Sequence, residues 1–374
     1  METRWVLQLC HGYSGPFLDV ARQYAALFHG HPCKVLTVYL TGLPDEKVAQ
    51  QSASDEVIFL NQSSRELRGL KIATLRAVKK IVASRKFVLV LAQRYKSIYT
   101  ACLATQLPVI GVHHAFGAYE RIQRRWFARC FQKRLALLAV SDAVRDEIRR
   151  ALPDWPHERI ETLHNRIDLA ETQHALLPRK QAREQLDLPP DALIIANVGR
   201  LHPDKDQATL IRAFALARDK LPASALLLIA GQGRLADDLR ALIEELGVAS
   251  RVRLLGQVPD VKRLFAAFDL FVLSSDHEPF GMVLLEAMAA QVPVMATHCG
   301  GTPEVVGDPR LLFELKNTEQ LAEHLCSFFA PDKAAFRQEV SAAGERRVRE
   351  KFDDGVVKAT FFALPMVKAA LNAQ

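Results

Sequence analysis

Two glutamates, Glu278 and Glu286, stand on either side of an apolar run in the stretch EPFGMVLLE. The run continues into AMAA, so the segment predicts a buried helix that is hydrophobic nearly all the way round. A carboxylate about two turns into such a helix needs hydrogen-bond donors. The adjacent hydroxyls of a ribose suit the two oxygens of Glu286. Glu278, roughly 12 Å away if the spacing is helical, would hold the hydroxyls of a sugar at the other end of the same ligand.

The residues between and around these glutamates suit an anion. Gly281 would let the backbone approach a ligand, and the free N–H groups of Gly281, Met282 and Val283 would bind a diphosphate with help from the helix dipole. The loop RLHPDKD adds Arg200 and Lys205, a guanidinium fork and a movable ammonium. Together these residues predict a nucleotide-sugar site. In the alternative, the cations are ordinary surface residues and the glutamates are solvated or paired within the protein.

The elements that would position these residues are strands that alternate with helices. Continuous Val, Ile and Leu runs, without apolar-polar alternation, are typical of parallel strands covered by helices on both faces. In such sheets ligands bind beyond the carboxyl ends of the strands, where the loops above lie. The runs are VLQLC, KVLTVYL, EVIFL, FVLVLA, PVIGVH and LALLAVS in the first half, and ALIIANVG, ALLLIAG, RVRLLG, LFVLSS and PVMAT in the second.

The chain has 374 residues, more than one hydrophobic core usually serves. We therefore expect two α/β domains, each doubly wound: an acceptor-side domain over residues 1–175 and a nucleotide-sugar-binding domain over 186–350. The segment between them combines prolines with charge. Residues 351–374 are expected to form helices that cross back to the first domain.

Composition narrows the class of protein. The six cysteines are scattered, which predicts neither a zinc site nor a disulfide framework, and no apolar segment resembles a signal peptide or a membrane span. A cytoplasmic protein is expected. The net charge of +7 favours anionic partners. Gly231 and Gly233 lack the third glycine of a dinucleotide fingerprint, so a nicotinamide-dependent enzyme is disfavoured.

Part of the positive charge lies in residues 121–134, RIQRRWFARCFQKR, which contain no acidic residue. On a helical wheel the apolar side chains fall on one side and the arginines opposite. This pattern is typical of a helix in a membrane interface, and equally of a helix packed on its own domain with a solvated basic face. It carries no recognised nucleic-acid motif.

Several of these motifs resemble those of the family 4 glycosyltransferases, retaining enzymes with the GT-B architecture of two Rossmann-like domains facing each other across a cleft. EPFGMVLLEA is similar to their Glu-x7-Glu signature, and VGRLHPDKD to the strand and loop that grip the donor diphosphate. PVMATHCGGTPEVV, AVSDAVRDEI and HNRID extend the resemblance over nearly the whole chain. The basic helix makes the chain similar to lipopolysaccharide-core sugar transferases, which favours contact of residues 121–134 with the cytoplasmic face of the inner membrane.

The resemblance implies roles for single residues. Glu286 would hold the donor ribose and Glu278 the donor sugar, while Arg200 and Lys205 would neutralise the departing diphosphate. His113 resembles the active-site histidine that faces the sugar, although its neighbour His114 is an alternative. These four residues, His113, Glu278, Arg200 and Lys205, are the expected catalytic set.

Two loops complete the expected site. Gly15, in HGYSGP, resembles the glycine that approaches donor phosphate and acceptor, and the loop near Val258 is a candidate for contacts with the base. The chain departs from the family pattern where Asp206, Gln291 and Arg166 replace usual glycines. These departures leave the charged donor-binding groups in place.

The expected reaction is transfer of a hexose, glucose or a relative, from a UDP-sugar to a hydroxyl of a lipopolysaccharide core or similar lipid-linked glycan. Retention follows from the resemblance alone. No Asp-x-Asp motif stands at a strand end, so neither a metal nor another cofactor is expected. Two alternatives remain: a nucleotide-sugar 2-epimerase of the same architecture, and a non-catalytic protein that binds a nucleotide sugar or an anionic polymer. Nucleic acid is not an expected partner.

Overall fold

The structure is a computed structural model that describes residues 3–15, 17–63, 65–67 and 69–372. The chain forms two compact units. The N-terminal unit contains residues 1–164 and 358–374, and the C-terminal unit contains residues 165–357. The chain thus passes between units at 164/165 and at 357/358, whereas the sequence-based boundaries lie at 175, 186 and 350.

The N-terminal unit is built on a seven-stranded parallel sheet with the strand order β3-β2-β1-β4-β5-β6-β7. Its strands are β1 (Trp5–Cys10), β2 (Lys34–Tyr39), β3 (Glu56–Phe59), β4 (Phe87–Gln93), β5 (Val109–His113), β6 (Leu135–Ala139) and β7 (Ile160–Thr162). Its helices are α1 (Phe17–Ala26), α2 (Glu46–Gln51), α3 (Ile72–Val82), α4 (Arg94–Ala104), α5 (Ile122–Phe131), α6 (Asp142–Ala151), the short η1 (His157–Arg159) and α16 (Pro365–Asn372).

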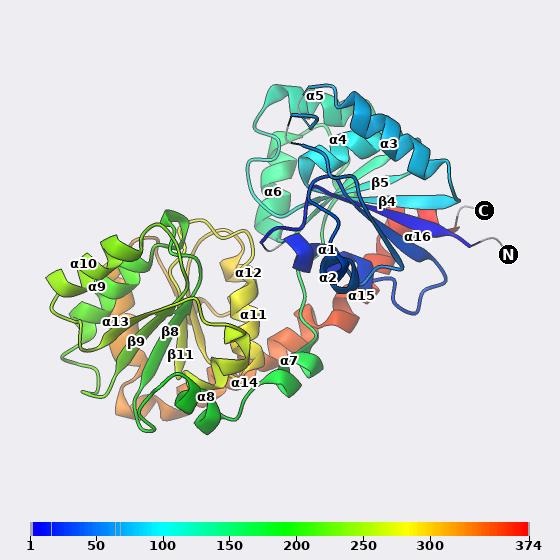
Figure 1. Ribbon diagram of the computed structural model, residues 1–374. Helices are drawn as coiled ribbons and strands as arrows, with labels where there is room; N and C mark the ends of the chain where they lie inside the picture. The colour runs from blue at the N-terminus through cyan, green and yellow to red at the C-terminus, as the bar shows by residue number, and fades with distance from the viewer. Residues whose placement is uncertain (1–2, 16, 64, 68, 373–374) are drawn as a thin grey trace. The chain divides into compact units, whose positions relative to one another are not determined.

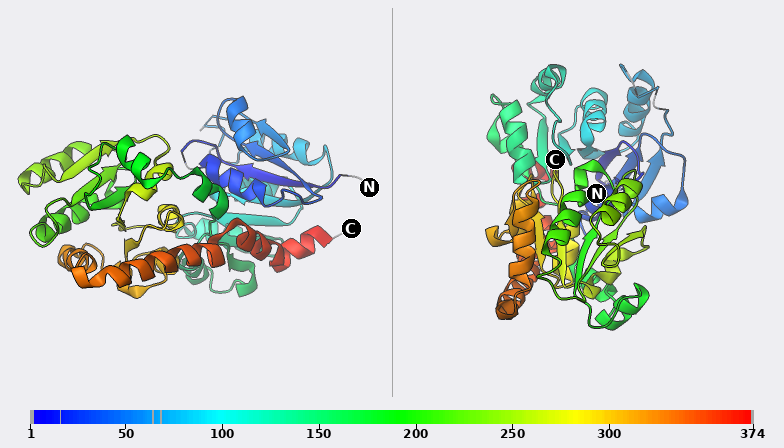
Figure 2. Two further views of the ribbon diagram at one scale, coloured as in Figure 1. Left: turned by 90° about the horizontal axis from the view of Figure 1, so that it is seen from below. Right: turned by 90° about the vertical axis from the view of Figure 1, so that its left-hand side faces the viewer.

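Helices cover both faces of this sheet, with α3 and α4 on one side and α1 and α16 on the other (Figure 1). Every residue of β1, β4, β5 and β6 is buried, as the continuous apolar runs predict. Helix α16, drawn in red in Figures 1 and 2, lies beside the sheet, and the Arg4 guanidinium donates to the Leu371 carbonyl over 2.6 Å.

The C-terminal unit has a six-stranded parallel sheet with the order β10-β9-β8-β11-β12-β13. Its strands are β8 (Ile194–Val198), β9 (Leu226–Ala230), β10 (Val252–Gly256), β11 (Leu270–Leu273), β12 (Val294–Thr297) and β13 (Leu312–Phe313). Its α-helices are α7 (Leu169–Ala175), α8 (Arg179–Gln185), α9 (Gln207–Ala217), α10 (Ala236–Glu245), α11 (Met282–Ala289), α12 (Thr302–Val306), α13 (Thr318–Phe328) and α14 (Ala334–Arg347). Shorter helical turns are η2 (Pro203–Lys205), η3 (Val261–Ala267), η4 (Pro309–Leu311), η5 (Pro331–Lys333) and η6 (Val348–Phe352), and α15 (Asp354–Ala363) runs across the boundary between units.

In Figure 1, α9, α10 and α13 lie on one side of the second sheet and α11 and α12 on the other. The strand order reverses between β1 and β4 in the first sheet and between β8 and β11 in the second. At such a switch point the helices after the two central strands diverge to opposite faces and leave a crevice beyond the strand ends. Both units are therefore doubly wound α/β structures, which confirms the predicted fold class. Within the described residues, no helix is long and apolar enough to cross a membrane.

Candidate active site

The apolar helix between the two glutamates is α11, and a glycine starts it. Gly281 has a φ of +98°, a left-handed conformation that side chains rarely adopt, and it occupies the position just before the helix without a side-chain cap. The first N–H groups of any helix lack partners within the helix. The loop after β11 therefore ends in backbone donors at the positive end of a helix dipole, as the sequence predicts, and these suit phosphate oxygens.

Glu278 lies in the loop before this helix and is buried, with 8% of its surface exposed. Its carboxylate accepts from the Lys205 ammonium over 2.6 Å and lies 3.4 Å from the Ser275 hydroxyl. The backbone carbonyl of Glu278 accepts from the Gly301 N–H over 2.9 Å. Glu278 is thus no solvated loop residue. The ion pair joins the ends of the two central strands, β8 and β11, at the switch point of the sheet.

Glu286 is the fifth residue of α11, just over one turn into the helix instead of the two turns expected. It is half-buried, and so are Met282 and Val283, whereas Leu284, Leu285 and Ala287 through Ala289 are buried. The half-buried positions fall on one face of the helix, since residues four apart are neighbours on a helix surface. The predicted ribose-binding carboxylate and the predicted phosphate-binding helix start therefore share one half-buried face of α11.

Arg200 and Lys205 occupy the loop between β8 and α9 but point differently. The Lys205 side chain is directed inward to Glu278 and is 19% exposed, whereas the Arg200 side chain is 70% exposed and lies 3.3 Å from Asp204. An exposed pair four residues apart contributes little free energy. Arg200 is therefore free to exchange Asp204 for a phosphate, while Lys205 is held in place.

Two glycines that sequence reasoning considered only as a nucleotide fingerprint position this loop. A Cβ at Gly231 would lie 1.8 Å from the Gly199 carbonyl oxygen, and a Cβ at Gly233 would lie 2.1 Å from the Leu201 carbonyl oxygen. The loop after β9 therefore packs backbone against backbone with the loop that carries Arg200. The glycines of the GQG pattern do indicate a close backbone contact, but the contact is with the loop that carries Arg200.

The departures from family glycines have structural explanations. Asp206 and Gln291 both adopt left-handed conformations, with φ of +41° and +56°, as glycine would. Asp206 also caps α9, because its carboxylate accepts from the Thr209 backbone N–H over 3.4 Å, and it accepts from the Thr209 hydroxyl over 2.7 Å as well. Burial raises the pKa of Asp206. Arg166 is buried and pairs with Asp354, so it anchors the start of the C-terminal unit to that unit's last segment.

Val258 lies beyond the edge strand of the C-terminal sheet and not at its two central strands. It follows β10, the edge strand, which β9 separates from β8. The residue is half-buried. Its place at the carboxyl edge of the sheet is compatible with a contact to the base, but no recorded hydrogen bond joins it to Arg200, Lys205 or α11.

His113 ends β5 in the N-terminal unit and His114 follows it directly, and the two side chains have different partners. His113 is buried, and its Nε2 lies 3.2 Å from the Tyr119 hydroxyl. Desolvation, with smaller effects of His114 and Arg124, lowers the pKa of His113 to about 3. The Nε2 of His114 lies 2.8 Å from Gln93 Oε1, and desolvation lowers its pKa to about 4. Both rings are neutral at pH 7, so either one would act on a sugar as a neutral hydrogen-bonding group.

Gly15, in the loop between β1 and α1, has a φ of +64°. A Cβ built there would meet no heavy atom within 4 Å. The glycine is therefore needed for backbone conformation, and the space beside it is open, as a loop that approaches a ligand requires. His113, His114 and Gly15 belong to the N-terminal unit, and the other predicted residues belong to the C-terminal unit.

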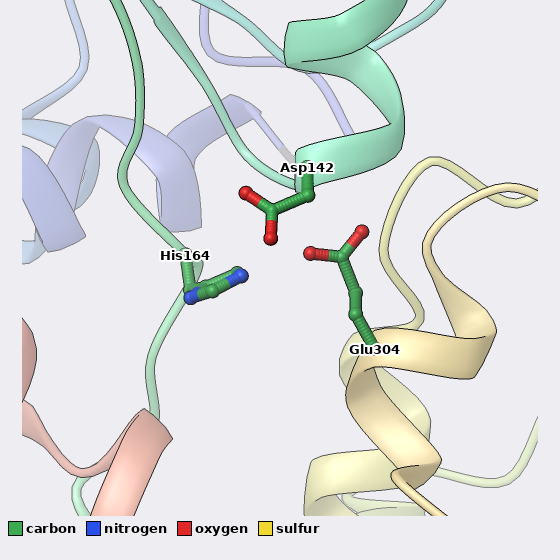
Figure 3. A group of neighbouring side chains, drawn as sticks. All are labelled: Asp142, His164 and Glu304. Carbon is green, nitrogen blue, oxygen red and sulfur yellow. The ribbon is translucent and has the colours of Figure 1, made fainter.

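Polar side chains that the sequence analysis did not single out lie beyond β6 and β7. Asp142, the first residue of α6, accepts from the Thr162 hydroxyl over 2.6 Å and from Arg145. A carboxylate oxygen of Asp142 and a ring nitrogen of His164 lie within 4.8 Å of each other (Figure 3). Figure 3 also labels Glu304, on α12 of the C-terminal unit. A carboxylate and an imidazole at neighbouring strand ends suit sugar hydroxyls, and the motifs AVSDAVRDEI and HNRID contain both residues.

The basic segment forms α5, which is shorter than the expected range 121–134. Two of its arginines are half-buried and bond to the backbone: Arg124 donates to the Ala118 carbonyl over 3.0 Å and Arg125 donates to the Tyr119 carbonyl over 2.6 Å. Arg129 is exposed, and so are two large apolar side chains, Ile122 (75%) and Trp126 (68%). Of the two arrangements considered, the one in which the whole apolar face packs on the domain is not observed, because Phe127 and Ala128 are buried but Ile122 and Trp126 are exposed.

A groove of about 700 Å³ runs beside α5. Helix α4 forms its other wall, and the lining is mostly apolar and aromatic. The lining residues are Tyr95, Tyr99, Leu103, Ile122, Gln123, Trp126, Phe127, Cys130 and Phe131.

Comparison with known proteins assigns a family to each half of the chain. Residues 178–347 match the family described as Glycosyl transferases group 1, and residues 17–171 match Glycosyltransferase Family 4. The lipopolysaccharide core biosynthesis glycosyltransferase LpsE of Rhizobium meliloti is 38% identical over 37% of this chain and 40% of its own length. The alpha-maltose-1-phosphate synthase of Mycolicibacterium smegmatis is 32% identical over 58% of this chain and 59% of its own. The matches thus span about two fifths to three fifths of these relatives.

Solved structures resemble the whole chain. A glycosyltransferase from Rickettsia africae superposes with a TM-score of 0.86 at 17% identity, over 100% of both chains. HepE from Anabaena, in complex with UDP-glucose, gives 0.78 at 20% identity over 99% of this chain and 100% of its own. WaaG, a glycosyltransferase involved in lipopolysaccharide biosynthesis, gives 0.69 at 18% identity over 97% and 99%. These likenesses show the GT-B fold, and the two family matches place each half of the chain, residues 17–171 and 178–347, in a glycosyltransferase family.

Proposed function

We propose that this protein transfers a hexose, glucose or a close relative, from a UDP-sugar to a hydroxyl of a lipopolysaccharide core or a similar lipid-linked glycan. The observation that carries the proposal is the buried contact of 2.6 Å between Lys205 and Glu278, beside the uncapped start of α11. A pyrophosphate fits the ammonium and the helix start, and a sugar hydroxyl fits the carboxylate. The complex of Anabaena HepE with UDP-glucose and the likeness to LpsE support the choice of donor and acceptor.

The proposed chemistry is retention by front-face attack. The acceptor oxygen forms a bond to the anomeric carbon, the bond from that carbon to the phosphate oxygen breaks, and the acceptor proton passes to a phosphate oxygen. Arg200, Lys205 and the start of α11 stabilise the charge that develops on the diphosphate, which preorganised donors do without reorganising. His113, which is neutral, bonds to the sugar. Since the chain's own cations carry this task, we propose that no metal takes part.

Calorimetry with UDP, GDP and ADP tests the donor site without added metal. Wild-type protein is expected to bind UDP in the micromolar range, and Glu286→Ala and Arg200→Ala to lose at least about tenfold in affinity, as expected for a charge-assisted contact. Arg212→Ala and Glu244→Ala remove exposed charges from α9 and α10 and serve as matched controls. If both Glu286→Ala and Arg200→Ala bind UDP as tightly as wild type, the assignment of these residues to the donor site is wrong.

Activity assays distinguish a transferase from an epimerase and from a non-catalytic binding protein. Incubation with UDP-glucose alone would convert it to the 2-epimer of the nucleotide sugar if the protein is an epimerase, whereas a transferase also needs an acceptor. Transfer that survives a chelator supports metal independence. Binding of UDP without turnover, with core acceptors present, would favour a non-catalytic protein.

We also propose that α5 lies in the cytoplasmic face of the inner membrane, which holds the acceptor near the site. Support comes from the exposed Ile122 and Trp126 and from the basic residues of the segment. An interfacial helix combines apolar anchors with basic residues that attract anionic lipids.

A further inference from the structure

The switch point of the N-terminal sheet, between β1 and β4, has features that the donor site leaves unexplained. The loop after β1 begins at His11, and α4 begins at Arg94, directly after β4. The Arg94 guanidinium carbon lies 4.5 Å from the centroid of the Phe17 ring, at the start of α1. Arg94 therefore brings the starts of α1 and α4 together beside this crevice.

Positive charge gathers here without compensation. Within the part of the chain that the structure describes, no carboxylate lies within ion-pair distance of Arg94, Lys96 or Lys71. The Lys71 ammonium lies 4.0 Å from the centroid of the Tyr99 ring. Burial and the Lys96 charge lower the pKa of Lys71, and burial with the charges of Lys96 and Arg94 lowers the pKa of His11. Neighbouring like charges without a counter-charge favour an anionic ligand.

The backbone at the start of α4 adds to this positive potential. Gln93, in the capping position, makes no side-chain cap, and the first turn contains no acidic residue. The N–H groups of that turn and the helix dipole are therefore available to an anion. Arg94 itself adopts a left-handed conformation with a φ of +69°, which is uncommon for a side-chain-bearing residue and tends to occur at functional sites.

A buried polar group in the same crevice lacks a partner. Gln93 is 4% exposed, and its Oε1 lies 2.8 Å from His114 Nε2, which holds the amide at the carboxyl ends of β4 and β5. Its Nε2, which can only donate, has no hydrogen-bond partner among the described residues, nor has the Nδ1 of His11. Leaving a buried donor unsatisfied is unfavourable. An acceptor oxygen on a ligand would remove this cost.

We propose that this crevice binds an anionic oxygen group, a phosphate or a carboxylate, carried by the acceptor glycan. The inference rests on the proposed transfer and narrows it, because the acceptor is then a negatively charged sugar chain. The donor diphosphate has cations of its own in Arg200 and Lys205. Arg94 and Lys96 would contact the anion, and the Gln93 amide would donate to it.

Calorimetry with three simple sugars tests the charge requirement. Glucose 6-phosphate and glucuronate are expected to bind to the full-length protein, and glucose to bind at least about tenfold more weakly, since it lacks a charge-assisted contact. Arg94→Gln and Lys96→Gln should each weaken glucose 6-phosphate at least about tenfold, whereas Lys80→Gln, an exposed change on α3, should not. Equal binding of glucose, or unchanged binding in both crevice variants, would overturn the proposal.

UDP binding by the two crevice variants shows whether these cations bind the phosphate of the donor or that of the acceptor. If Arg94→Gln and Lys96→Gln leave UDP affinity unchanged, the crevice is distinct from the donor site, as proposed. Weaker UDP binding in both would show that these cations serve the donor, and the acceptor assignment would fall. If wild-type protein binds no nucleotide, the proposed function fails, yet the sugar-phosphate result still decides the crevice.

A second measurement does not depend on the variants. The pKa of His11, followed by NMR, is expected to rise when glucose 6-phosphate occupies the crevice, because an anion offsets the charges of Arg94 and Lys96. Glucose should leave this pKa unchanged. An unchanged His11 pKa at saturating glucose 6-phosphate would place the phosphate elsewhere.

Discussion

At the scale of single residues, Lys205 and Glu278 form an ion pair that is largely shielded from solvent. Side-chain exposures of 19% and 11% mean that each charge depends on the other for solvation. We predict that Lys205→Met or Glu278→Leu alone lowers the free energy of unfolding by about 1–3 kcal/mol, because each leaves a half-buried charge. The double variant should lose less than the sum.

Urea unfolding of the four proteins in a double-mutant cycle measures this coupling. The exposed pair Arg240 and Asp237 is the matched control, since its side chains are 64% and 94% exposed and its loss should cost under about 1 kcal/mol. Additive effects of Lys205→Met and Glu278→Leu would show that the two side chains are not coupled.

The two buried histidines predict a dependence of stability on pH. The folded pKa values of about 3 and about 4 lie below the unfolded value near 6.5. The unfolded chain therefore binds protons first as the pH falls, and stability present above pH 6.5 is lost below it. Between pH 7 and pH 5 each ring should lower the free energy of unfolding by about 2 kcal/mol.

His113→Gln tests this prediction. The variant should be less stable at pH 7 but should lose about 2 kcal/mol less than wild type on going to pH 5. His157→Gln, an exposed change in η1, should leave the pH-dependent loss as it is. If wild type and His113→Gln lose the same free energy of unfolding between pH 7 and pH 5, the folded protein does not lower the pKa of His113.

At the scale of elements, the loops at the strand ends depend on close backbone packing. A Cβ at Gly233 would lie 2.1 Å from the Leu201 carbonyl oxygen, and neither backbone can yield without moving the Arg200 loop. We predict that Gly233→Ala costs about 1–3 kcal/mol of stability and weakens UDP binding. Thermal unfolding and calorimetry check both effects.

Gly355→Ala is the control for this substitution. A Cβ at Gly355 would meet only the Asp353 side chain, at 3.7 Å, and alanine favours the helix α15. UDP affinity in this variant should equal that of wild type. A Gly233→Ala protein with normal UDP affinity would show that the loop after β9 does not position Arg200.

The sequence predicts most elements but not all. The eleven apolar runs coincide with eleven strands, and the central ones are almost wholly apolar because both of their faces are buried. β7 and β13 were not expected. They contain three and two residues at sheet edges, too few to give a hydrophobic run. The sequence also left two packings of α5 open, since a helical wheel shows which side chains share a face but not which face packs on the protein.

At the scale of the whole molecule, the net charge of +7 and the exposed apolar side chains of α5 predict binding to anionic membranes. Trp126→Gln should weaken binding to vesicles of phosphatidylglycerol and phosphatidylcholine about tenfold, as expected for one large apolar side chain left in water. Added salt should also weaken binding of the wild-type protein to these vesicles.

Leu216→Gln removes another large exposed apolar residue, 58% exposed on α9, and should leave vesicle binding unchanged. Co-sedimentation measures all three proteins. Equal effects of the two substitutions, or equal binding to neutral vesicles, would argue against a specific role of α5.

The sequence by itself determined the class of fold, the two-unit organisation and the family, because these depend on local patterns: apolar runs, glycines at helix starts and charges at fixed spacing. It also indicated Glu278, Glu286, Arg200 and Lys205. Only the tertiary structure decided how these groups are used. Lys205 turns inward to Glu278 whereas Arg200 remains exposed, and the buried Gln93 amide is left without an acceptor among the described residues. Burial and pairing join residues far apart in the chain, so no local pattern records them.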